Sequence, residues 1–189
     1  LREMTGAGLS DCKKALAESE DMDGAVAYLR KKGQAVAAKR SDREAAEGCV
    51  LVKAVDGFGA IIALKCETDF VANNADFVAL TQEILDAAVA NKCKTLDEVK
   101  ALPMGDGTVA DAVTARSGIT GEKMELDGYS YIESDNICTY NHMNRNGLCA
   151  MVALSAPVAD ETVGKNVAMQ IASASPVAID ESGVPQEVK

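Results

Sequence analysis

The side chains best suited to nucleophilic chemistry in this sequence are six cysteines and a single histidine, His142. One histidine excludes any site that needs two imidazoles, such as the H-E-x-x-H zinc motif. Cys66 or Cys149 could pair with His142, with the imidazole taking the proton of the attacking thiol. Both cysteines lie within apolar, strand-like runs, where a reduced thiol packs as a small, inert hydrophobe. A cysteine-dependent hydrolase is therefore the weaker interpretation.

Other catalytic patterns are missing from the sequence. It contains neither a phosphate-binding loop nor a G-x-G-x-x-G fingerprint, and its carboxylates are spread over turns and helix faces as on a solvated surface. We therefore expect a protein that is not an enzyme, that holds no metal and no cofactor, and that acts by binding another protein.

The stretch KCETDFVANNADF, residues 65–77, places an aromatic side chain, Phe70, in a polar break after the apolar run AIIAL. The chain has only three Phe and no Trp, so a ring among Asp and Asn residues needs a reason. In one interpretation the strand continues past Lys65 and Phe70 belongs to the core. In the other, Phe70 is exposed on a loop beside Asp69 and inserts into a partner, because aromatic rings dominate the energetics of interfaces. The residues alone leave both interpretations open.

The charge balance narrows the class of partner. The 189 residues carry 29 Asp and Glu against 19 Lys and Arg, a net charge of −10. Such a surface repels phosphate backbones and anionic lipids, so we expect neither direct nucleic-acid binding nor membrane binding, and a partner with a basic face is favoured.

The spacing of the cysteines and the lack of a targeting segment in the sequence predict the cellular compartment of the protein. The cysteines show no C-x-x-C spacing, which favours reduced thiols and a cytoplasmic location. The sequence shows no signal peptide and no apolar run of membrane-spanning length. Since the first residue is Leu1 rather than Met, we expect the natural start to be missing.

Apolar spacing predicts three helices in residues 1–33. Ser10 is the expected N-cap of the second helix, and Gly33, which follows three basic residues, is the expected stop of the third. Residues 34–48, rich in Ala and charge, are expected to form a solvated helical linker.

From residue 49 the apolar period becomes two. Two strands joined by the turn Asp56-Gly57 are followed by an amphipathic helix, and a second strand pair is later followed by another helix. The predicted strands are 49–55, 58–66, 122–134, 137–143 and 147–156, and the predicted helices are 75–90, a short one capped by Thr95 and Glu98, one capped by Thr108, and 161–175.

This repeated order of strand pair, polar break and helix predicts two related halves and an α+β fold, with antiparallel strands flanked by helices. The predicted organisation is a helical module at 1–40, a linker at 41–48, and core subdomains at 49–117 and 118–189.

Two motifs carry a resemblance to a known family. TDFVAN at 68–73, after a hairpin and before an amphipathic helix, and LREMTGAGLSDCKKAL at the start resemble the signatures of the bacterial elongation factor Ts family. The hairpin YNHMNRNG at 140–147 extends the resemblance over the whole chain. It implies a ubiquitin-associated-like helical module followed by two related α+β subdomains. It also implies a guanine-nucleotide exchange factor, which promotes GDP release from elongation factor Tu, the GTPase that carries aminoacyl-tRNA during translation elongation.

The resemblance also assigns residues. Asp69 and Phe70 correspond to the intruding pair, and Thr68 and Val71 complete the motif associated with dislodging Mg²⁺ from the partner. The residues implied to bind the partner are Arg2, Leu9, Ser10, Ala72, Asn73 and His142. An alternative remains open, in which the chain is a non-enzymatic adaptor that docks a partner through its helical module.

Overall fold

The three longest strands form one antiparallel sheet in the order β1-β2-β5. The structure is a computed structural model and describes residues 1–188. Its helices are α1 (Arg2–Thr5), α2 (Leu9–Ala17), α3 (Met22–Lys39), α4 (Asp69–Ala72), α5 (Ala75–Ala90), α6 (Leu96–Ala101), α7 (Val109–Thr120) and α8 (Glu161–Ala174). Its strands are β1 (Glu47–Val55), β2 (Phe58–Cys66), β3 (Pro103–Met104), β4 (Gly107–Thr108), β5 (Glu125–Glu133), β6 (Ile137–Asn141) and β7 (Cys149–Ala153). Short 3-10 turns are η1 (His142–Asn144), η2 (Glu181–Gly183) and η3 (Gln186–Val188).

The β1–β2 hairpin is closed by the predicted Asp56-Gly57 turn. Both residues have positive φ, 48° and 77°, which is the backbone that type I′ hairpin turns require. The two strands then pair without interruption from Val55–Phe58 to Glu47–Cys66. The antiparallel strands and their flanking helices confirm the α+β class.

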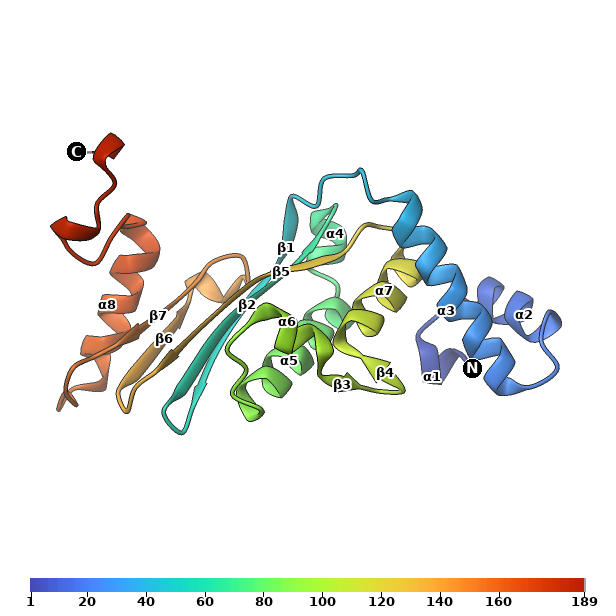
Figure 1. Cartoon of the computed structure of the whole chain (residues 1–189), viewed down its shortest axis with the longest axis horizontal. Coiled ribbons are helices and arrows are strands. Elements are labelled where there is room, and N and C mark those ends of the chain that lie inside the picture. The colour runs from blue at the N-terminus through green and yellow to red at the C-terminus, as the bar shows by residue number, and fades with distance from the viewer. Residues whose placement is uncertain (189) are drawn as a thin grey trace.

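The main core lies between this sheet and α5. Side chains along one face of β2 are buried, and α5 covers them with Phe77, Ile84 and Leu85, which are fully buried. Figure 1 shows α5, α6 and α7 together on one side of the sheet, and β6, β7 and α8 on the other. On that second side Ile137 of β6 lies over Gly59 of β2, where an added Cβ would be 3.1 Å from the Ile137 Cγ2 atom.

The helical module joins the core through α3. This helix continues through Gly33 to Lys39, so the predicted stop at Gly33 is wrong. Gly33 is buried because it crosses α7 at Gly118, where a Cβ on Gly118 would be 2.5 Å from the Cα of Gly33. The glycine therefore permits close helix packing rather than ending the helix. The predicted N-cap is also wrong, since α2 begins at Leu9 with Gly8 as its cap and Ser10 inside its first turn.

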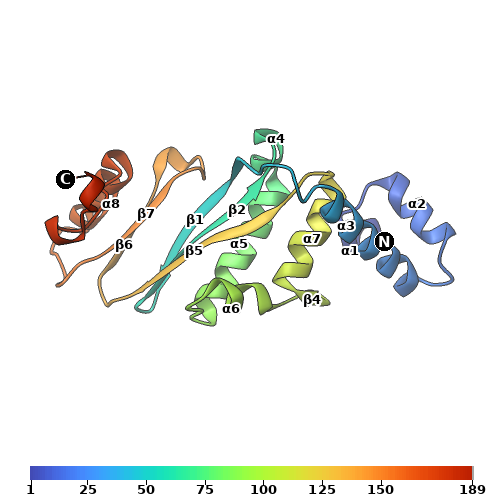
Figure 2. The same cartoon turned by 45° about the horizontal axis from the view of Figure 1, so that its top comes forward.

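The second strand pair and helix form a smaller unit at the other end of the molecule. β6 and β7 pair antiparallel, and α8 packs on them over a buried cluster of Ala150, Ala168 and Ala172. β5, which lies in the predicted second subdomain, hydrogen-bonds to β2 in the sheet of the first. Figures 1 and 2 show an elongated arrangement, with α1 and α2 at one end and α8 at the other. Within residues 1–188 no helix combines the length and the apolar character needed to cross a membrane.

Candidate partner-binding site

The segment 68–73, here called the α4 turn, is a single helical turn between β2 and α5. Thr68 is its N-cap and accepts a hydrogen bond from the N–H of Val71 at 3.4 Å. The N–H of Ala72 donates to the Thr68 carbonyl at 3.1 Å. At the other end, the backbone N–H and the side-chain amide of Asn73 both donate to the carbonyl of Asp69, at 2.9 and 2.8 Å. The turn is thus closed at both ends by its own residues.

The α4 turn has an inward and an outward face. Ala72 is buried and Val71 packs against the main core, whereas Asp69 is exposed and Phe70 is 85% exposed. β2 ends at Cys66, so the strand does not continue to Phe70, and the interpretation that puts Phe70 in the core is wrong. The α4 turn therefore presents an exposed aromatic ring beside an exposed carboxylate, and its inward face is fixed against the main core.

The turn also makes a contact with a distant segment. The Thr68 hydroxyl donates to the carboxylate of Glu122 at 2.6 Å, and the N–H of Thr68 donates to the same carboxylate at 3.1 Å. Glu122 follows α7, whose left-handed C-cap is Gly121. The residue patterns of the sequence gave no sign of this contact, since it joins residues 54 positions apart.

The other residues implied by the resemblance lie elsewhere on the molecule. Arg2, Leu9 and Ser10 are exposed on α1 and α2, at the end of the molecule where Figure 2 shows the N-terminus. His142 follows β6 in η1, where its N–H donates to the carbonyl of Leu148 at 2.8 Å. The structure therefore gathers residues 68–73 into one turn and leaves the helical module and His142 as separate surfaces.

The thiols lack the features of a nucleophile. Burial raises the pKa of both Cys66 and Cys149 to about 11. Cys66 donates to the carbonyl of Thr68 and Cys149 to that of Val50, each at 3.2 Å. The Nδ1 atom of His142 lies 3.2 Å from the hydroxyl of Tyr140. Both thiols are protonated near neutral pH, and in the described chain their hydrogen bonds go to backbone carbonyls rather than to the imidazole.

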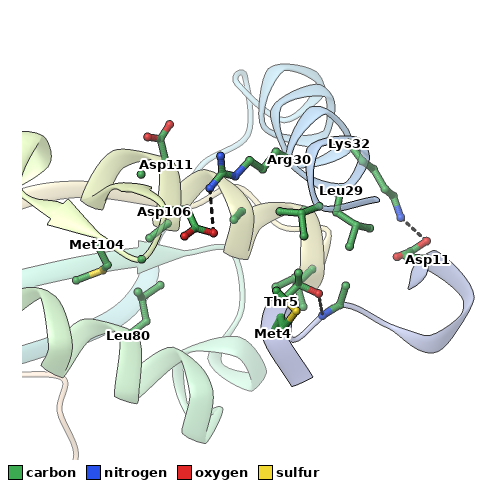
Figure 3. Close-up of a pocket in the computed structure, with 18 of the residues that line it drawn as sticks. Met4, Thr5, Asp11, Leu29, Arg30, Lys32, Leu80, Met104, Asp106 and Asp111 are labelled. Carbon is green, nitrogen blue, oxygen red and sulfur yellow. Dashed lines mark hydrogen bonds and ion pairs between the residues drawn. The ribbon is translucent and has the colours of Figure 1, made fainter. Parts of the chain in front are cut away.

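A cavity of about 340 Å³ lies where the helical module meets the core. Figure 3 shows Met4 and Leu29 of the module across from Leu80 and Met104 of the core. The rim carries paired charges, with Lys32 beside Asp11 and the Arg30 guanidinium 3.7 Å from the Asp106 carboxylate. Sequence reasoning missed this cavity, because its lining comes from five separate helices and the β3–β4 turn. Among residues 1–188 no cluster of His, Cys, Asp and Glu is arranged to hold a metal ion.

Comparisons with known proteins agree with the two motifs. The family model described as Elongation factor TS matches residues 67–189. Elongation factor Ts of Bacteroides fragilis is 71% identical over 190 aligned residues, and that of Bacteroides thetaiotaomicron is 68% identical; each alignment covers 100% of this chain and 57% of the relative. Elongation factor Ts of Porphyromonas gingivalis is 52% identical, with 100% of this chain and 69% of the relative covered. The chain thus spans little more than half the length of the Bacteroides relatives. By the extent of the model match and by these identities, the chain belongs to the elongation factor Ts family.

Proposed function

We propose that the chain acts in translation elongation, in the cytoplasm, as the guanine-nucleotide exchange factor of elongation factor Tu. The observation that carries this proposal is the exposure of Phe70 on the α4 turn. The protein is poor in aromatic rings, and the other two Phe residues, Phe58 and Phe77, are fully buried. An exposed ring on a rigid support favours insertion into a partner, because it loses little conformational freedom on binding.

The proposed mechanism is a displacement by Phe70, which we call the wedge. Mg²⁺ and the phosphate-binding loop of a GTPase together neutralise the nucleotide's phosphates. The wedge enters an apolar slot between two helices of the GTPase and shifts the segment that supports the Mg²⁺ site. Asp69, exposed beside it, brings a negative charge to the same region. Loss of the metal leaves the diphosphate less neutralised, and GDP dissociates faster.

Thermodynamic linkage sets a second requirement. If the exchange factor weakens GDP binding by some factor, GDP must weaken the binding of the exchange factor by the same factor. The chain should therefore bind the nucleotide-free GTPase most tightly. No bond of the nucleotide is broken, so the protein catalyses release without chemistry and is not an enzyme in the chemical sense.

The helical module supports a second contact with the same partner. Met4, Leu9 and Leu16 are exposed by 67%, 57% and 47%, although all three are large and apolar. Leu9 and Leu16 are seven positions apart on α2 and so share one face of it, and exposed apolar side chains on one face are typical of protein interfaces. The same observation favours the adaptor alternative, in which the module alone docks a partner. Deleting the module would uncover α7, because α3 packs on it, so point substitutions are the cleaner way to separate the two functions.

The direct test measures the release of fluorescent GDP from elongation factor Tu with and without this chain, at fixed Mg²⁺. An exchange factor accelerates release at substoichiometric concentration, because each molecule acts repeatedly. An adaptor binds the GTPase without changing the release rate. A release rate that does not respond to the chain at any concentration sinks the proposal.

A further inference from the structure

A single carboxylate from a distant loop holds the start of the α4 turn. Glu122 accepts the backbone N–H groups of Glu67 and Thr68, each at 3.1 Å, and the Thr68 hydroxyl at 2.6 Å. Three hydrogen bonds to one charged acceptor form a strong contact, since each is stronger than a bond between neutral groups. The direction in which β2 passes into α4 is therefore set from the α7–β5 connection.

The contact is reciprocal. The Glu67 carboxylate accepts the backbone N–H of Lys123 at 2.6 Å, while the Glu67 N–H donates to Glu122. The two loops thus hold each other through backbone N–H groups. The Glu67 carboxylate is also bound by the guanidinium of Arg40, the C-cap of α3, at 2.9 and 3.1 Å. Lys123 in turn donates through Nζ to the carbonyls of Ser41 and Arg43, both at 3.1 Å.

The α4 turn depends on these bonds. The helix α4 within it is four residues long, and a helix of that length is unstable on its own, because nucleation fixes several residues for one hydrogen bond. The Thr68 hydroxyl has one proton and gives it to Glu122, which leaves its oxygen free to accept from the N–H of Val71. Without Glu122 the hydroxyl would be free to rotate, and the first turn would lose its fixed orientation.

We propose that Glu122 is a positioning residue for exchange: its carboxylate sets the angle at which Phe70 projects, without touching the partner itself. This inference rests on the proposed function, because it assigns a role in the same displacement. Three observations support it. Glu122 accepts three hydrogen bonds at the start of the α4 turn, it lies 54 residues from Thr68 along the chain, and the Phe70 ring on that turn is 85% exposed.

The test compares Glu122→Ala and Glu122→Gln with the wild-type chain in fluorescent-GDP release from elongation factor Tu. A mispositioned wedge should lower the maximal release rate roughly tenfold in Glu122→Ala, with a smaller effect in Glu122→Gln, which keeps one carbonyl acceptor. The half-saturating concentration should change little. A purely structural loss would reduce the amount of active protein, which raises that concentration and leaves the maximal rate unchanged. That second pattern would overturn the inference.

Glu98→Ala is the matched control. Glu98 accepts the N–H groups of Lys94 and Thr95 at the start of α6, as Glu122 does at the start of α4, but it serves a different turn. It should leave the maximal rate at the wild-type value. Amide hydrogen exchange at residues 67–71 should accelerate in Glu122→Ala and stay unchanged in Glu98→Ala. If Glu122→Ala does not fold, Thr68→Val removes the same hydroxyl and should lower the maximal rate, and a wild-type rate in that variant would overturn the inference.

A double-mutant cycle with Phe70→Ala separates the inference from the proposed function. If Glu122 acts through Phe70, the double variant should be about as slow as Phe70→Ala alone, because interacting residues are not additive. Additive losses would overturn the positioning role and leave the exchange function standing. A wild-type rate for Phe70→Ala would overturn both.

Discussion

Replacing Phe70 by Ala removes the proposed wedge with little effect on the fold. The ring is 85% exposed, so its removal should change the free energy of unfolding by less than about 0.5 kcal/mol. Burying a whole Phe side chain contributes about 1.5–3 kcal/mol. Since 85% of the residue's surface is available for burial, the wedge can contribute about 1.3–2.5 kcal/mol. At about 1.36 kcal/mol for each tenfold change, GDP release should slow by roughly tenfold to seventyfold.

The assay is stopped-flow fluorescence of labelled GDP leaving elongation factor Tu at a saturating concentration of the chain, with excess unlabelled GDP. Phe70→Leu keeps part of the apolar volume and should give an intermediate rate. Ile179→Ala is the control, because Ile179 is fully exposed in the C-terminal segment. Chelating Mg²⁺ should narrow the gap between wild type and Phe70→Ala, since no metal is then left to displace.

Two results would refute the reasoning. Phe70→Ala could release GDP at the wild-type rate with an intact fold, which would mean that the ring does not act in the partner. Alternatively, Ile179→Ala could slow release as much as Phe70→Ala, which would mean that any loss of exposed apolar surface weakens binding. Urea unfolding and circular dichroism of each variant show whether the fold is intact.

Three further predictions concern the helix crossing, the thiols and the helical module. Gly118→Ala would place a Cβ 2.5 Å from the Cα of Gly33, so the free energy of unfolding should fall by about 1–3 kcal/mol. The fall should appear as a lower urea midpoint, and an unchanged midpoint would contradict the close crossing of α3 and α7. Burial raises the pKa of Cys66 and Cys149 from 9.0 to about 11, so the folded state keeps protons that the unfolded chain releases. The contribution of these thiols to the free energy of unfolding should therefore fall as the pH rises from 9 toward 11, measured as the urea midpoint across that range, and a flat profile there would count against their burial. Leu9→Asp places a charge on an exposed apolar position, so it should weaken binding to elongation factor Tu, measured by titration calorimetry, without changing the urea midpoint. Wild-type affinity in this variant would show that this face of the helical module is not part of the interface.

Local patterns in the sequence predicted the elements whose signals are unambiguous. The predicted strand 58–66 and the predicted helix 75–90 have the bounds of β2 and α5. The Asp56-Gly57 turn was predicted because few residue pairs adopt positive φ at both positions. The capping box at Thr95 and the N-cap at Thr108 also formed as expected, since a cap is decided within four residues.

Features that depend on distant segments were missed. A glycine that follows basic residues gives the same sequence signal whether it ends a helix or lets two helices pack closely. Gly33 lets α3 pack closely on α7. The stretch after Cys66 has too few apolar residues to show a helical period, so the capped turn at 69–72 was expected to be a loop. The contact of Thr68 with Glu122 joins two loops through hydrogen bonds, which leave no periodic pattern along the chain. The structure shows Phe70 exposed, which is one of the two interpretations that the residues left open, but the contact that holds its turn could not be foreseen.

The small buried cluster beneath α8 implies that the second half of the molecule depends on the first half for its stability. Ala150, Ala168 and Ala172 bury little apolar area, and side chains this small stabilise a fold weakly. The β6–β7 hairpin is stabilised by two contacts with the β1–β2 hairpin. The Val50 N–H donates to the Asn146 carbonyl at 2.6 Å, and Ile137 packs on Gly59. Loosening the β1–β2 hairpin would therefore release the α8 end as well. The reverse does not follow, since the first half holds its own large core.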